Sequence, residues 1–151
     1  MRFPLFVLAI GVAAAMAAPA AANNVVVKML NRGQAGPMVF EPALVKIAPG
    51  DTVTFIAADK GHNAESIAGM IPTGSAPFRG KMSETVTVKF AKQGLYGFKC
   101  FPHYGMGMVG VVIVGKPSAN LDAAKKVTHP GKARQVFANL LARIQAQSAS
   151  R

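Results

Sequence analysis

Short segments in which apolar and polar residues alternate, separated by turns, make up the chain between residues 24 and 114. The alternation is strict at 52–56 and 85–90, and Pro49-Gly50-Asp51 is a typical turn. A period of two is that of a β-strand with one buried face. Turns that recur roughly every 8–12 residues indicate an all-β sandwich. The remaining expected strands are 25–30, 38–47 with a break at Pro42, 95–100 and 108–114.

The pattern becomes helical after Gly115. Ser118 or Asn120 can cap a short helix that runs to Val127, and a longer helix follows with Pro130 near its first turn. An apolar stripe with spacings of three and four lies along the longer helix, and we expect it to pack on the sandwich. A helix face that binds a partner is the alternative interpretation. The stripe consists of Ala133, Val136, Phe137, Leu140, Leu141 and Ile144.

Residues 1–22 are typical of an export signal that is cleaved. Arg2 precedes an apolar run at 5–16, Pro19 ends the run, and Ala20-Ala21-Ala22 is a small-residue cleavage site. An uncleaved membrane anchor is the alternative, but no later segment is long and apolar enough to cross a bilayer. We therefore expect one mature domain, residues 23–151, that is soluble and exported to the periplasm.

Cys100 is the one cysteine of the chain. An exported thiol that cannot form an internal disulfide is either buried and inert or held by a metal. It begins the motif Cys-x2-His-x4-Met, formed with His103 and Met108, between the end of one expected strand and the start of the next. Upstream, His62 follows a turn at Gly61 and could supply a second imidazole.

The ligand types in this motif select the metal. Two histidines and one cysteine in a trigonal array, with a long and weak axial methionine, are the ligands of type 1 (blue) copper. Zinc binds a thioether poorly, and iron–sulfur clusters usually need four cysteines. Each residue alone is more often structural, but their joint occurrence favours one copper ion held by His62, Cys100, His103 and Met108. The spacing favours Met108 over Met106 as the axial ligand, and we expect both Met106 and His129 at the surface.

The chain is strongly basic. Without Arg2, its 17 basic residues become 16 against 6 acidic ones, a net charge of +10. This excess either keeps the surface soluble or steers the protein toward an acidic partner. Nucleic acid is not expected as a partner, because the protein is predicted to be exported and shows no nucleic-acid motif.

The sequence resembles the cupredoxin family and, within it, the pseudoazurin group. The stretches that carry the resemblance are 38–42, 49–55, 59–63, 70–72 and the loop 100–108, and the match covers nearly the whole mature chain. The resemblance implies an eight-stranded Greek-key sandwich with two C-terminal helices and the four copper ligands named above. Phe101 departs from the group's pattern, in which a small polar residue is common at this position.

The resemblance also implies roles for residues around the ligands. The backbone N–H of Asn63 is expected to donate to the Cys100 thiolate, and Pro102 has no N–H to add a second such bond. A thiolate with fewer hydrogen bonds is more electron-rich, which lowers the reduction potential. His103 is the expected electron port, within an apolar patch that a ring of cations surrounds. The expected docking residues are Arg32, Met38, Lys60, Arg79, Lys99 and Met106.

The predicted function is that of a soluble, monomeric one-electron carrier. The resemblance implies transient partners with acidic faces, such as a copper nitrite reductase of denitrification and c-type cytochromes. A periplasmic copper chaperone or buffer is the alternative, although a closed two-histidine, one-cysteine site argues against it. An enzyme is not expected, because the sequence shows no second copper motif, no Ser–His–Asp set and no paired carboxylates.

Overall fold

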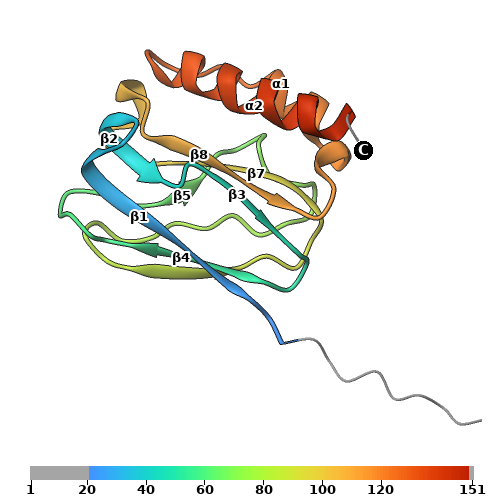
Figure 1. Cartoon of the computed structure of the whole chain (residues 1–151), viewed down its shortest axis with the longest axis horizontal. Helices are drawn as coiled ribbons and strands as arrows, with labels where there is room; N and C mark the ends of the chain where they lie inside the picture. The colour runs from blue at the N-terminus through green and yellow to red at the C-terminus, as the bar shows by residue number, and fades with distance from the viewer. Residues whose placement is uncertain (1–20, 150–151) are drawn as a thin grey trace, which may run out of the picture.

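Two four-stranded sheets lie face to face in the computed structural model, which describes residues 21–149 (Figure 1). All but the last two residues of the predicted export signal lie outside this range. One sheet has the order β2 (Gly36–Glu41), β1 (Asn24–Gly33), β4 (Thr52–Ile56), β6 (Val86–Lys89). The other has the order β3 (Leu44–Ile47), β8 (Val109–Val114), β7 (Gly94–Lys99), β5 (Glu65–Ser66). The predicted sandwich is confirmed.

The connections cross between the sheets. β1 pairs with β4 in parallel, and β3 pairs with β8 in parallel, while the other pairings are antiparallel. Parallel neighbours cannot be joined by a hairpin, so the chain passes from one sheet to the other between them. Two short 3-10 turns, η1 (Tyr104–Met106) and η2 (Pro117–Ala119), flank β8.

The helices α1 (Leu121–Lys125) and α2 (Ala133–Ala149) form a third layer on the outer face of the β8 sheet (Figure 1). The predicted apolar stripe of α2 is buried there, with Phe137 and Ile144 in one cluster with Val111 of β8. The alternative of a partner-binding stripe is therefore wrong. Within residues 21–149, no helix is both long and apolar enough to span a membrane.

Strand β8 is buried on both faces, and this explains its unbroken apolar sequence. Val112 and Val114 belong to the core between the sheets, whereas Val109, Val111 and Ile113 pack against the helices. A strand covered on both sides needs no polar face, so its alternation is lost.

Helix α1 begins directly after Asn120, one of its two predicted caps, but the predicted capping contact is absent, whereas α2 begins later than the sequence predicts. The side chain of Asn120 does not cap α1, because it accepts from the Leu95 N–H and donates to the Leu95 carbonyl, each at 2.8 Å. The longer helix begins at Ala133 because the chain first turns at Gly131, where φ is +49°. The N–H of Lys132 then donates to the carbonyl of Gly105 at 2.9 Å, which ties the start of α2 to the turn at η1.

Candidate metal centre

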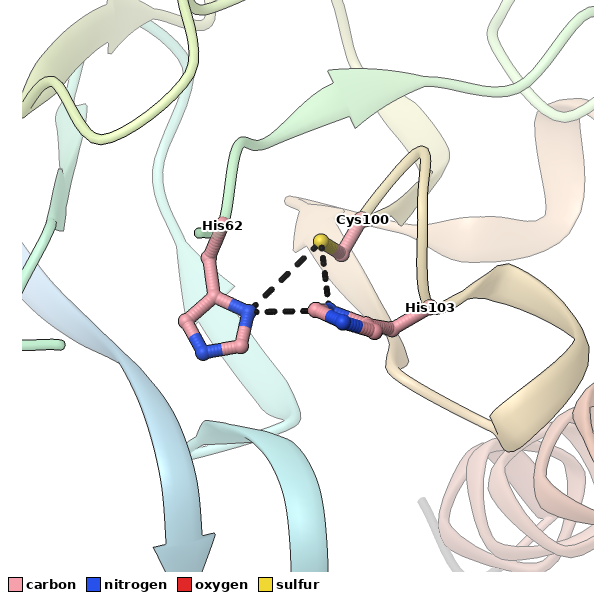
Figure 2. A group of neighbouring side chains, drawn as sticks. All are labelled: His62, Cys100 and His103. Carbon is pink, nitrogen blue, oxygen red and sulfur yellow. Dashed lines mark hydrogen bonds between the residues drawn. The ribbon is translucent and has the colours of Figure 1, made fainter. Parts of the chain in front are cut away.

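Three potential ligand atoms meet at one end of the sandwich. Figure 2 shows the imidazoles of His62 and His103 turned toward the sulfur of Cys100. The two Nδ1 atoms are 3.1 Å apart, and Sγ lies 3.8 Å from Nδ1 of His62 and 3.5 Å from Nδ1 of His103. A point equidistant from the three atoms lies about 2.0 Å from each, which is the length of a metal–nitrogen bond in proteins. These side chains fit a metal ion.

Strand alternation points the cysteine inward. β7 ends at Lys99, and Phe98 and Cys100 both belong to the core between the sheets. Two backbone hydrogen bonds close the loop that follows: the N–H of Cys100 donates to the Met108 carbonyl at 3.0 Å, and the N–H of Met108 donates to the His103 carbonyl at 3.2 Å. Met108 is fully buried and Met106 is 49% exposed, which agrees with their predicted places. The axial role of Met108 stays a prediction.

Asn31 selects the form of His62 that can bind a metal. Its side-chain Oδ1 lies 2.8 Å from Nε2 of His62. An amide oxygen only accepts hydrogen bonds, so Nε2 carries the proton and Nδ1 keeps a lone pair directed at Cys100 and His103. The backbone N–H of Asn31 donates to Asp59 Oδ2 at 2.7 Å, which also anchors the loop before His62. The sequence contains no signal that links position 31 to position 62.

Burial favours the neutral forms of Cys100 and His62 in the absence of metal. It raises the pKa of the Cys100 thiol, the backbone N–H groups of Asn63 and His103 oppose this rise, and Glu65 adds to it. Burial also lowers the pKa of His62, which His103 lowers further and Asp59 raises. The predicted N–H donor of Asn63 is therefore present, and His103 supplies a donor that was not foreseen.

The side chain of Asn63 joins the two segments that carry the ligands. Its Oδ1 accepts from the N–H of Phe101 at 2.8 Å, and its Nδ2 donates to Glu65 Oε2 at 3.2 Å and to the Gly80 carbonyl at 3.3 Å. Pro102 lies exposed in the turn between Cys100 and His103. Asn63 thereby limits the movement of Cys100 relative to His62.

The predicted docking residues differ in exposure. Arg32, Lys60, Arg79 and Met106 are exposed, whereas Met38 and Lys99 are half-buried. Met38 has a positive φ of 50° within β2, and Lys99 forms an ion pair with Glu65. The structure does not test their part in docking.

The prediction that His129 lies at the surface is wrong. Its side chain is buried and stacks on Phe137 with a centroid distance of 4.2 Å. Its Nδ1 lies 2.7 Å from the hydroxyl of Tyr104, within hydrogen-bonding distance. A histidine in front of a proline at a helix start is usually solvated. Here the turn at Gly131 places the ring between α2 and the ligand loop, residues 100–108.

The fold and this centre define a small β-sandwich metalloprotein, and known proteins agree. The family model for copper binding proteins of the plastocyanin/azurin family matches residues 27–115. Pseudoazurin from Methylorubrum extorquens is 49% identical over 136 residues, which cover 90% of this chain and 92% of that protein. Pseudoazurin from Paracoccus pantotrophus is 48% identical over 130 residues, covering 86% and 90%.

Solved structures show the same likeness. The pseudoazurin of Methylobacterium extorquens AM1 superposes with a TM-score of 0.78 at 49% identity, over 81% of this chain and 99% of that one. The pseudoazurin of Hyphomicrobium denitrificans gives a TM-score of 0.76 at 46% identity, over 80% and 97%.

The chain belongs to the plastocyanin/azurin family of copper-binding proteins and, within it, to the pseudoazurins. Members of this family are electron carriers rather than enzymes, and the cofactor is one copper ion. His62, Cys100 and His103 would hold this ion, with Met108 as the predicted fourth ligand, and copper would supply a one-electron couple between Cu(I) and Cu(II). The protein itself holds its ligands in one arrangement and shields His62, Cys100 and Met108 from water.

Proposed function

We propose that this carrier is exported as a soluble monomer to the periplasm and passes single electrons to a copper nitrite reductase in denitrification. Acidic c-type cytochromes are its other proposed partners. Export rests on the predicted signal at residues 1–22. The choice of partner rests on the positive charge of the expected docking residues Arg32, Lys60, Arg79 and Lys99, and on the likeness to pseudoazurins.

The exposure of the ligands carries the proposal. His62, Cys100 and Met108 are buried, whereas His103 is half-exposed and lies between the centre and the solvent. The neighbouring cations Arg32 and Lys60 lie on the segments that hold His62. An acidic partner would approach quickly through charge attraction and would leave quickly because the apolar contact is small.

The same burial argues against a copper chaperone. A chaperone must release its metal to another protein, which requires ligands that a second site can reach. Here the sulfur of Cys100 and the ring of His62 are inaccessible, and hydrogen bonds accepted by Asn63 and Asn31 hold the segments that carry them. Electron transfer needs no ligand to leave its place.

Stopped-flow oxidation of the reduced, copper-loaded protein by nitrite reductase tests the proposal. We expect the second-order rate constant to fall as ionic strength rises, and to fall in Lys60→Glu. Lys89→Glu is the matched control, because Lys89 pairs with Thr52 at the end of β4 that is remote from His62. A rate constant that is flat or rises with salt would refute steering by charge.

A further inference from the structure

Phe101 is a large apolar side chain that the fold leaves in solvent. It is 58% exposed, although it directly follows the fully buried Cys100. Adjacent residues of a strand point to opposite faces, so Lys99 at the end of β7 points away from the core that Cys100 enters. Phe101 follows in the turn after the strand and stays exposed. Within residues 21–149 the exposed large apolar residues are Val26, Met82, Phe101 and Met106, and two of these four lie in the ligand loop.

Two cations flank the ring of Phe101. The Arg79 guanidinium lies 5.5 Å and the Lys99 ammonium 5.9 Å from the ring centroid. Such contacts contribute little to stability at an exposed site. Their consequence is an arrangement in which an exposed apolar ring lies beside two positive charges.

Glu65 holds both cations in place. It pairs with Lys99 along β5 and β7 and forms a bridge with Arg79 on its other side. Its carboxylate lies 3.1 Å from Arg79 Nε and 3.5 Å from Lys99 Nζ. The side chains of Glu65 and Lys99 are only 10% and 21% exposed, whereas that of Arg79 is 72% exposed. A docking partner would therefore meet chiefly the Arg79 guanidinium rather than the carboxylate, and the three groups together keep a charge of +1.

The position of Phe101 is also coupled to the metal centre. Its N–H donates to Asn63 Oδ1 at 2.8 Å, and Asn63 in turn donates to Glu65. The ring and its two cations therefore have a rigid support, and little conformational entropy is lost when a partner binds.

We propose that Phe101 determines partner specificity, by binding an apolar patch that carboxylates surround on an acidic redox protein. An aromatic residue at the centre of a charged rim is the usual form of an interface hot spot. The ring would pack on the partner's apolar patch while Arg79 and Lys99 face its carboxylates. This inference rests on the proposed function, and it adds a contact on the β5–β7 side of His103.

The test compares Phe101→Thr, Phe101→Tyr and the control Val26→Thr, which replaces a methyl group of an exposed apolar residue on β1 with a hydroxyl. Each copper-loaded, reduced protein is oxidised in the stopped flow by nitrite reductase, by an acidic c-type cytochrome and by ferricyanide. Ferricyanide is an anion that responds to charge but offers no apolar patch. Titrations of the reduced protein with each protein partner, followed by NMR, give dissociation constants that do not depend on electron transfer.

For Phe101→Thr we expect the rate constant and the affinity with the protein partners to fall by about threefold or more, because apolar contact is lost. The ionic-strength slope, the ferricyanide rate, the visible spectrum and the potential should not change, because neither a charge nor a backbone hydrogen bond is removed. Phe101→Tyr and Val26→Thr should resemble the wild type.

Three results would overturn the inference. The inference would be rejected, and the proposed function left intact, if Phe101→Thr reacted with the protein partners as fast as the wild type while the wild-type rate constant still fell with ionic strength. A slower ferricyanide reaction or a shifted potential would place the role of Phe101 in the metal centre instead of in docking. Failure of the wild type to react with either protein partner would reject the proposed function and this inference with it.

Discussion

At the scale of single residues, the centre depends on which hydrogen-bonding atoms stay free for a metal. Asn31 binds Nε2 of His62 and so leaves Nδ1 available, while backbone N–H groups of Asn63 and His103 are directed at the sulfur of Cys100. The first contact sets a tautomer and the second sets the electron density on the thiolate. Both are made by residues that are not ligands themselves.

Pro102→Ala adds a backbone N–H next to the thiolate. A further hydrogen bond withdraws electron density from sulfur and disfavours Cu(II), so we expect a higher reduction potential in voltammetry. Pro77→Ala, in another exposed loop, is the control and should leave the potential unchanged. A potential for Pro102→Ala that is unchanged or lower would contradict this account of the thiolate.

Asn31→Leu removes the hydrogen-bond acceptor of His62. The ring then loses its preferred tautomer and orientation, and we expect the copper affinity to fall about 10–100-fold. Competition with a chelator of known affinity measures this change. Asn24→Leu is the matched control, because Asn24 lies on the same strand and accepts from the hydroxyls of Thr52 and Thr54, away from the ligands. Similar losses in both variants would mean that Asn31 acts through general stability.

At the scale of elements, α2 supports the ligand loop as well as covering the sheet. The Lys132 N–H bonds the Gly105 carbonyl, and the Tyr104 hydroxyl meets His129, whose ring stacks on Phe137 of α2. Within residues 21–149, Nε2 of His129 is buried without a hydrogen-bond partner. A buried imidazole of this kind is tolerated while it is neutral, and protonation would place a charge in an apolar contact.

His129 should therefore make stability depend on pH. Burial lowers the pKa of His129, so below about pH 6.5 the unfolded chain takes up the proton more readily than the folded one. The free energy of unfolding of the copper-free protein should fall as pH drops from about 6.5 to the lowered folded-state pKa. Urea unfolding at a series of pH values measures this slope.

Two substitutions separate the charge from the hydrogen bond. His129→Phe and His129→Gln should both reduce the pH dependence of the free energy of unfolding. The contribution of His62 to that dependence is the same in the wild type and in both variants. At pH 7.5 the phenylalanine variant should be less stable than the glutamine variant by about 1 kcal/mol, because it gives the Tyr104 hydroxyl no partner. A wild-type slope retained in both variants would show that His129 does not titrate on unfolding.

At the scale of the whole molecule, the fold keeps the Cys100 thiol protonated until copper arrives. Because burial raises the pKa of the Cys100 thiol, copper must displace one proton there. We expect the affinity for Cu(I) to rise about tenfold per pH unit between about pH 7 and pH 9, measured against a Cu(I) chelator without oxygen. An affinity that does not change over this range would mean that the thiol is already ionised in the folded, copper-free protein.

Local patterns predicted much of this molecule. The strands followed from alternation, the stripe on α2 followed from spacings of three and four, and the motif from Cys100 to Met108 indicated copper by ligand type alone. These signals lie within short stretches, where the side-chain period directly reports which face is buried. The predicted capping contact of Asn120 and the predicted start of α2 were wrong because a distant contact, with Leu95 or with Gly105, replaced the local one.

The sequence by itself determined the ligand types, the sandwich and the basic surface. Only the tertiary structure decided that Asn31 orients His62, that Glu65 holds Arg79 and Lys99 beside Phe101, and that His129 is buried under α2. The physical reason is that hydrogen bonds, ion pairs and ring contacts act over a few ångströms in space. Residues far apart in the chain reach that distance only after the sheets have paired, so no local pattern records them.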